Sequence, residues 1–449
     1  MPRTPHNPVV SDLIFPAGFL WGAATAAHQV EGDNVNSDWW DWERAPGTPC
    51  VEPSGSACEH YTLYPQDIAL LASLGLNTYR FSVEWARIEP AEGTFDAKEL
   101  DHYRAVVDCV RANGLTPMVT LNHFTLPRWV AAQGGWTAKR TPALFERYCR
   151  RVLEALGDGV PWYCTINEPT AVASGAYLSG WGQPPGVVDY GLWRKAVAGL
   201  VDGHKRAVAA VHDVRPGAKA GLAIFSLDRI TNAGGKPAMD LKCRVEEEVF
   251  LEGAADDDFI GVQTYSRHYL YMRRLAAPLT RMALALRPLD RLIVPRILAL
   301  KTAAPGTLAL PGARLTQMGW EYRPDALAAV VRRIARFYPE KDLVVTEHGV
   351  ATLDDRERVE FIVHGLAALH GAMAEGLRVR GYIHWSLLDN FEWAAGYRPK
   401  FGLIGVDRAT QERTVRPSAR LLGEIARTGR LTADQATGSP LRTGADRGE

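Results

Sequence analysis

The chain has 449 residues, of which 47% are hydrophobic and 23% charged, an ordinary globular composition with ample apolar material for a core. Lys+Arg and Asp+Glu both number 51, so the net charge of zero argues against nucleic acid as a partner and against bulk attraction to a membrane. The N-terminal residues show no signal-peptide pattern and no apolar run is long enough to span a membrane, so we expect a cytoplasmic protein. The six cysteines form no C-x-x-C pair, which favours free buried thiols over disulfides.

Short apolar runs alternate with longer helical patterns, an order typical of repeated β-α units around a parallel sheet. The predicted strands cover residues 19–24, 77–83, 116–121, 162–166, 218–224, 259–264, 343–346 and 381–386. The predicted helices cover residues 64–74, 97–113, 142–156, 189–214, 238–250, 324–337, 354–375 and 417–428. Eight alternating pairs predict an α/β fold, a single (β/α)8 TIM barrel.

The barrel is expected to occupy residues 1–431 as one domain. It would include a lid-like insertion at about residues 270–316, between the sixth strand and its helix. Residues 432–449 are polar and rich in Gly, Ser and charges, which predicts a disordered tail.

Two glutamates each end an apolar, strand-like run. Residues 164–170 read C-T-I-N-E-P-T, and Pro169 disfavours a helical conformation at Glu168, so Glu168 is expected where a strand ends. Residues 343–349 read L-V-V-T-E-H-G and place Glu347 at the equivalent point. Because the C-terminal ends of all barrel strands meet on one face, the two carboxyl groups should lie close together. One protonated and one ionised carboxyl group across a glycosidic bond is the arrangement that glycosidases use.

Four further motifs occur in a defined order with these two. The chain opens with F-P-A-G-F-L-W-G-A-A-T-A-A-H-Q-V-E-G and continues with Y-R-F-S-V-E-W-A-R-I-E-P, T-I-N-E-P, V-T-E-H-G, H-W-S-L-L-D-N-F-E-W-A-A-G-Y and K-F-G-L-I-G-V-D. This set resembles glycoside hydrolase family 1, the β-glucosidase family of retaining (β/α)8 enzymes, over residues 15 to about 428.

The resemblance implies catalytic roles for the two glutamates. Glu168 is similar to the general acid/base of the family and Glu347 to its nucleophile, with Arg80, Tyr265 and Gln263 supporting the nucleophile. Such an enzyme is expected to release the terminal non-reducing β-linked sugar from small glycosides by double displacement, with carboxyl groups about 5–5.5 Å apart. No cofactor and no metal are expected.

The resemblance also implies a set of sugar-binding residues that combine polar groups with aromatic planes. These are Gln29, His123, Asn167, Trp385, Glu392, Trp393 and Phe401. A carboxylate at Glu392 would repel a phosphate, so a small, unphosphorylated β-glycoside is the expected substrate. Trp320 is assigned to packing, and Glu84, near the second strand, is assigned to an ion pair with Arg87 or a neighbouring helix.

Three positions depart from the common family pattern. His348 replaces the Asn of T-E-N-G, Gln263 begins Q-T-Y where N-Y-Y is usual, and His123-Phe124-Thr125 replaces H-W-D. Neither carboxylate is lost, but the choice among glucose, galactose and fucose is left open. The acid-rich run at residues 246–258 is expected to be a solvated face without metal ligands.

Residues 270–301 carry seven cations against a single acid, among many apolar side chains. One interpretation is a lid suited to hydrophobic aglycones. A surface helix resting on an anionic membrane is a less favoured interpretation, and a helical pair packed on the barrel or at a dimer contact is a third. The protein is expected to be a monomer or a homodimer. A transglycosylase, or a catalytically silent carbohydrate-binding relative, is the alternative to a hydrolase.

Overall fold

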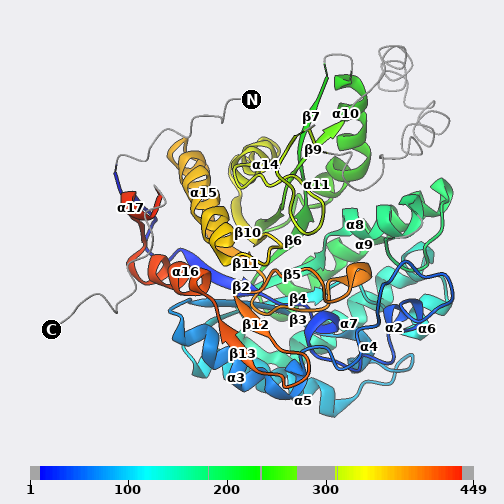
Figure 1. The fold of residues 1–449 in the computed structure, drawn as a ribbon. Helices are drawn as coiled ribbons and strands as arrows, with labels where there is room; N and C mark the ends of the chain where they lie inside the picture. The colour runs from blue at the N-terminus through cyan, green and yellow to red at the C-terminus, as the bar shows by residue number, and fades with distance from the viewer. Residues whose placement is uncertain (1–10, 180–181, 233–234, 271–308, 311, 437–449) are drawn as a thin grey trace.

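The computed structural model describes residues 11–179, 182–232, 235–270, 309–310 and 312–436. Eight parallel strands close into a barrel in the order β10-β11-β2-β3-β4-β5-β6-β8 (Figure 1). Their bounds are β2 Leu20–Ala24, β3 Thr78–Ser82, β4 Thr116–Asn122, β5 Trp162–Asn167, β6 Lys219–Phe225, β8 Phe259–Gln263, β10 Asp342–His348 and β11 Val379–Trp385. The predicted TIM barrel is confirmed. Both ends of each predicted barrel strand lie within two residues of the observed ends.

Alternation along the strands separates two apolar layers. Side chains that face the barrel axis, such as Met118, Cys164, Val344 and Ile383, form one fully buried cluster. The residues between them face the helices and join a larger cluster around the barrel. Because both faces of each strand are covered, the strands are almost continuously apolar, which is why they could be predicted from the sequence.

The surrounding helices begin where the sequence supplies caps. Asp96, Asp189 and Asp354 each accept a backbone N–H at the start of a helix. The major helices are α3 His60–Ser73, α5 Ala97–Ala112, α7 Thr141–Leu156, α9 Tyr190–Val214, α14 Ala326–Ala335, α15 Asp355–Ala374 and α16 Pro417–Thr428. Within the described residues, none of the helices has the length and apolar content that crossing a membrane requires.

The helix predicted at residues 238–250 is divided. Helix α10 (Lys236–Cys243) passes through a π-helical turn at Arg244–Glu248 into α11 (Val249–Gly253). Beside α10, strands β7 (Asp228–Thr231) and β9 (Arg267–Leu270) form a small parallel sheet outside the barrel (Figure 1). Pairing between such short segments is a long-range contact, which periodicity in the sequence does not reveal.

The C-terminal segment differs from the prediction at its start. Helix α17 (Ala433–Ala436) follows strand β14 (Arg430–Leu431), which pairs with β1 (Leu13–Ile14). The side chain of Asp12 accepts hydrogen bonds from Arg430 and from the Ala433 N–H. The first residues of the predicted tail are therefore ordered by contact with the N-terminal strand.

The acid-rich run is solvated only at some of its acids, such as the exposed Glu252, so the prediction of a solvated face was wrong for the buried acids. Glu247 is fully buried, as Glu246 and Asp257 nearly are. Glu247 pairs with Arg229 at 2.6 Å and with Arg333 at 2.6 Å, and Asp257 lies 2.9 Å from His204. Glu247 and Asp257 are thus paired with side chains from other elements of the fold. The prediction of free thiols is confirmed, because all six cysteines are unpaired.

Candidate active site

The ends of β5 and β10 bring Glu168 and Glu347 to the C-terminal face of the barrel. Glu168 directly follows β5 and precedes α8 (Pro169–Ser174). Its φ of 44° lies in the left-handed region, which non-glycine residues seldom adopt, and Pro169 disfavours the right-handed alternative. The Glu168 N–H donates to the carbonyl of Ala223 at 2.8 Å, which fixes this turn to the neighbouring strand β6.

Three side chains hold the carboxyl group of Glu347. Arg80, from β3, forms an ion pair with its Oε1, and the Tyr265 hydroxyl donates to its Oε2. Gln263, from the end of β8, donates its Nε2 to Glu347 Oε1 at 2.8 Å. The longer amide of Gln263 thus still reaches the carboxyl group. These are the three residues predicted to support the nucleophile.

The environments of the two carboxyl groups differ. Burial and the nearby charge of Glu347 raise the pKa of Glu168 well above its ordinary value, and Glu392 adds to the rise. Burial also raises the pKa of Glu347, but the Arg80 guanidinium and the Tyr265 hydroxyl oppose that rise. Within the described residues, no hydrogen bond to the Glu168 carboxyl group is found, whereas Glu347 accepts three. We therefore assign the proton to Glu168 and the charge to Glu347.

Asn167, at the end of β5, connects this strand to β3 and β8 through its side-chain amide. Its Oδ1 accepts from Arg80 Nη2 at 2.6 Å and from Gln263 Nε2 at 2.7 Å. Its Nδ2 lies 3.1 Å from Nε2 of His123, whose pKa is held well below its usual range by burial and by Arg80. A neutral His123 accepts this bond on Nε2 and therefore carries its proton on Nδ1.

The loop after β11 delivers Glu392 and Trp393 to the same face. Gln29 ties this loop to the N-terminal segment by donating to the Phe391 carbonyl at 2.7 Å. Burial and the charge of Glu347 raise the pKa of Glu392 to about 8. The His123 ring lies parallel to both Trp385 and Trp393, with ring centroids 6.0 and 6.1 Å away.

An aromatic wall stands beside Tyr265. The rings of Phe401 and Trp320 lie 5.9 and 5.7 Å from Tyr265, and 6.3 Å from each other. Trp320 packs as predicted, but it packs against Tyr265, which contacts Glu347. Its place beside the site was missed because residues 317–320 lie far from every motif of the sequence analysis.

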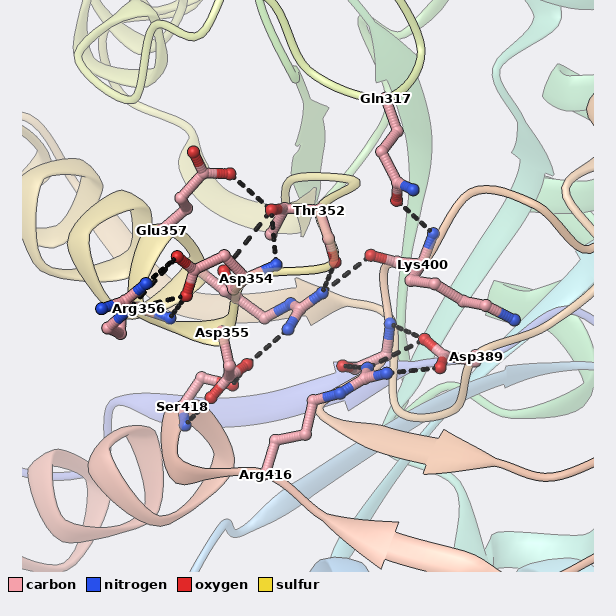
Figure 2. Close-up of polar contacts among 12 residues, drawn as sticks. Gln317, Thr352, Asp354, Asp355, Arg356, Glu357, Asp389, Lys400, Arg416 and Ser418 are labelled. Carbon is pink, nitrogen blue, oxygen red and sulfur yellow. Dashed lines mark hydrogen bonds and ion pairs between the residues drawn. The ribbon is translucent and has the colours of Figure 1, made fainter.

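A polar network holds the loop that carries Phe401 (Figure 2). Arg416 donates to both oxygens of Asp389, at 2.9 and 2.6 Å, and Asp389 accepts the Gly402 N–H at 2.9 Å. On the other side, the Lys400 N–H donates to Gln317 at 3.0 Å and the Lys400 carbonyl accepts the Thr352 N–H at 3.0 Å. The loop is thus anchored on both sides of Phe401.

Glu84 has a different partner from the predicted one. It accepts the Thr125 hydroxyl at 2.8 Å and the Ala86 N–H at 3.1 Å, so it caps the short helix α4 (Trp85–Ile88). Arg87 instead pairs with Glu31 at 2.9 Å. The Thr125 of the divergent His-Phe-Thr segment therefore anchors Glu84, a link that only the folded chain reveals.

The structure places all the predicted site residues at or near the C-terminal ends of the barrel strands. Five of the predicted sugar-binding or supporting side chains keep a buried polar atom without a hydrogen-bond partner in the described part of the chain: Gln29 Oε1, Arg80 Nε, His123 Nδ1, Gln263 Oε1 and Glu392 Oε2. Buried polar atoms cost free energy unless they are satisfied, and a hydroxylated ligand would satisfy such a set. Among the described residues, no cluster of three or more His, Cys, Asp or Glu could hold a metal.

Comparisons with known proteins find relatives that match most of the chain. The sequence model of glycosyl hydrolase family 1 matches residues 11–274 and 235–430. The thermostable β-glucosidase B of Thermobispora bispora is 35% identical, over 93% of this chain and 91% of its own length. A bifunctional β-D-glucosidase/β-D-fucosidase of Bifidobacterium breve is 33% identical, over 90% and 96%. A solved β-glycosidase from Pyrococcus horikoshii is 33% identical with a TM-score of 0.83, over 96% and 99%.

Proposed function

The chain belongs to glycosyl hydrolase family 1, and on that premise we propose that it hydrolyses small β-glycosides with retention of anomeric configuration. The chain is a glycoside hydrolase that acts on O-glycosyl bonds. The proposed substrate is an unphosphorylated β-glycoside whose terminal non-reducing sugar is released. Because one relative is a β-glucosidase and another also a β-fucosidase, we propose glucose and fucose as the first sugars to test.

The proposal depends above all on the difference between the surroundings of Glu168 and those of Glu347. Glu347 accepts hydrogen bonds from Arg80, Tyr265 and Gln263. It attacks the anomeric carbon while Glu168 donates its proton to the leaving oxygen. Once Glu347 is esterified it no longer carries a charge, so the pKa of Glu168 falls. Glu168 then acts as a base and takes a proton from the water that releases the sugar.

The remaining site residues are proposed to bind the sugar. Gln29, His123, Asn167 and Glu392 supply polar groups, and Trp385, Trp393 and Phe401 supply flat apolar surfaces. The partly buried Trp320 extends the wall beyond Phe401, so we place the aglycone along it. No cofactor takes part in the proposed mechanism.

The two alternatives are less well supported. A silent sugar-binding protein has no need for a carboxyl group of raised pKa opposite an ion-paired one, yet both are present here. The interpretations of a lid, of membrane contact and of transglycosylation all depend on residues 270–301. Residues 271–308 lie outside the described part of the chain, so these interpretations stay predictions.

Stereochemistry and substrate choice are tested together. Aryl β-glycosides of glucose, fucose, galactose and 6-phosphoglucose are supplied to the enzyme, and the first-formed sugar anomer is identified by proton NMR. We expect β-glucoside or β-fucoside to be cleaved with the β-anomer formed first, and the 6-phosphoglucoside to be refused. An α-anomer formed first would contradict double displacement, and cleavage of the 6-phosphoglucoside would contradict the proposed restriction to unphosphorylated sugars.

A further inference from the structure

His348 follows Glu347 in β10 and faces the opposite side of the barrel wall. Alternation along the strand turns Glu347 inward, so the His348 side chain enters the layer between β10 and α15. It is fully buried there. Its ring lies nearly parallel to Phe361 of α15, with centroids 4.7 Å apart, and its Nδ1 is 3.0 Å from the Tyr382 hydroxyl of β11.

Gly365 of α15 makes room for this ring. A Cβ atom at position 365 would lie 2.6 Å from Cε1 of His348, much closer than carbon atoms approach without displacement. Gly365 lies one helical turn beyond Phe361, so both residues face His348. The imidazole is thus enclosed by α15 on one side and by β11 on the other.

The end of β10 depends on such contacts because its ladder is irregular. The register of β10 shifts between Val345 and Glu347 against β8, and between Val345 and His348 against β11. Irregular pairing redirects side chains and is frequent beside active sites. On the inner side, Arg80 also donates to the Thr346 carbonyl at 3.2 Å. On the outer side, the packing of His348 against Phe361 and its hydrogen bond to Tyr382 hold the same end of β10.

We propose that His348, seated against Gly365, is a positioning residue that fixes the end of β10 and thereby the reach of Glu347. The proposal rests on the proposed role of Glu347 as nucleophile. Burial lowers the pKa of His348 to about 3, so the residue is neutral under working conditions and acts through shape and its hydrogen bond to Tyr382. His348 and Gly365 then form a matched pair, and changing either member alone displaces Glu347.

The test measures the first chemical step alone. A 2,4-dinitrophenyl 2-deoxy-2-fluoro-β-glucoside esterifies the nucleophile and inactivates the enzyme, because the fluorine slows release of the sugar. The inactivation rate constant and the inactivator affinity are measured for wild type, Gly365→Ala, His348→Asn and the double variant. Gly371→Ala, in the same helix, is the matched control, since a Cβ at Gly371 meets no atom within 4 Å.

We expect Gly365→Ala to slow inactivation by about tenfold or more with little change in affinity, since small misplacements of a reacting group cost rate rather than binding. The double variant should react at the rate of His348→Asn, because the three atoms nearest to the new methyl group all belong to the imidazole that this variant lacks. Gly371→Ala should react like wild type. Equal rates for Gly365→Ala and Gly371→Ala would overturn the proposal, as would a double variant slower than both single variants.

Two readouts keep the result interpretable. If Gly365→Ala does not fold, the test rests on His348→Asn. Inactivation of His348→Asn at the wild-type rate would overturn the positioning role. Mass spectrometry of the labelled wild-type peptide tests the proposed function separately. A label on Glu347 together with unchanged variant rates refutes only the positioning role, whereas a label elsewhere refutes the assignment of the nucleophile.

Discussion

The guanidinium of Arg80 forms an ion pair with the carboxylate of Glu347 while both side chains are almost completely withdrawn from solvent. The same guanidinium donates to Asn167 at 2.6 Å, so one cation orients residues at the ends of two barrel strands. Charges this deeply buried are tolerated only when they are paired and hydrogen-bonded. The pair thus gives Arg80 a direct part in the ionisation of Glu347.

Replacing Arg80 by Gln should therefore change both the rate and its pH dependence. Burial raises the pKa of Glu347 and Arg80 opposes the rise, so without Arg80 the pKa rises further. Since the proposed attack by Glu347 requires its ionised form, the acid limb of kcat/KM should move to higher pH, with kcat/KM at neutral pH lower by about 10²-fold or more. Arg194→Gln, an exposed substitution on α9, should leave the pH profile unchanged. An unmoved acid limb in Arg80→Gln would contradict the assignment.

Esterification of Glu347 should lower the pKa of Glu168. The charge of Glu347 is, after burial, the main cause of the raised pKa of Glu168, and the glycosyl-enzyme lacks that charge. Titration of ¹³C-labelled glutamate by NMR, before and after trapping with the fluoroglucoside, measures the change. We expect a fall of about one unit or more. A pKa of Glu168 that stays constant on trapping would mean that Glu347 does not govern its protonation.

The buried Glu247, in the π-helical turn between α10 and α11, should contribute strongly to stability. Burial favours the neutral form of Glu247, but Arg229 and Arg333 outweigh it and hold the pKa of Glu247 below its ordinary value. The stabilisation is therefore present above the unfolded-state pKa of Glu247 and is lost as the pH falls through its folded-state pKa. Glu247→Gln should lower the free energy of unfolding by about 3–5 kcal/mol at neutral pH.

Urea unfolding monitored by circular dichroism measures that loss. The exposed Glu252→Gln, in the same segment, is the matched control and should change the unfolding free energy by less than about 0.5 kcal/mol. If the two variants unfold alike at neutral pH, Glu247 does not carry the predicted stabilisation.

The anchored loop of Figure 2 should affect substrate binding more than chemistry. Arg416 holds Asp389 and the backbone beside Phe401, but it contacts neither Glu168 nor Glu347 in any described interaction. Arg416→Met should therefore raise KM for aryl glycosides by about tenfold with a smaller change in kcat, because a loosened Phe401 weakens binding before and during reaction alike. Arg420→Met, exposed on the adjoining helix α16, is the control. A fall in kcat at unchanged KM would contradict this interpretation.

The barrel and the placement of Glu168 and Glu347 at the ends of its strands could be predicted because their signals are local. A strand covered on both faces is an apolar run, and Glu168 and Glu347 each stand at the end of one. The outward direction of His348 also follows from alternation next to Glu347. The burial of Glu247 could not be predicted, because its partner Arg333 lies on a distant helix and a run of acids resembles a solvated surface.

Contacts between distant segments account for the other differences. Trp320 packs against Tyr265, and Thr125 donates a hydrogen bond to Glu84. Both contacts depend on how loops from different strands meet. Such contacts leave no periodic pattern in the sequence. The space that Gly365 leaves for His348 could not be predicted either, since a glycine inside a helix does not indicate which residue packs against it.

Azide rescue tests the two catalytic assignments most directly. Glu347→Gly and Glu168→Ala are each given a dinitrophenyl β-glucoside with azide, and the glucosyl azide produced is identified by NMR. Double displacement predicts the α-azide from Glu347→Gly, since azide replaces the nucleophile in a single inversion. It predicts the β-azide from Glu168→Ala, since azide attacks the glycosyl-enzyme. The same anomer from both variants, or undiminished hydrolysis by either variant without azide, would contradict the proposed roles.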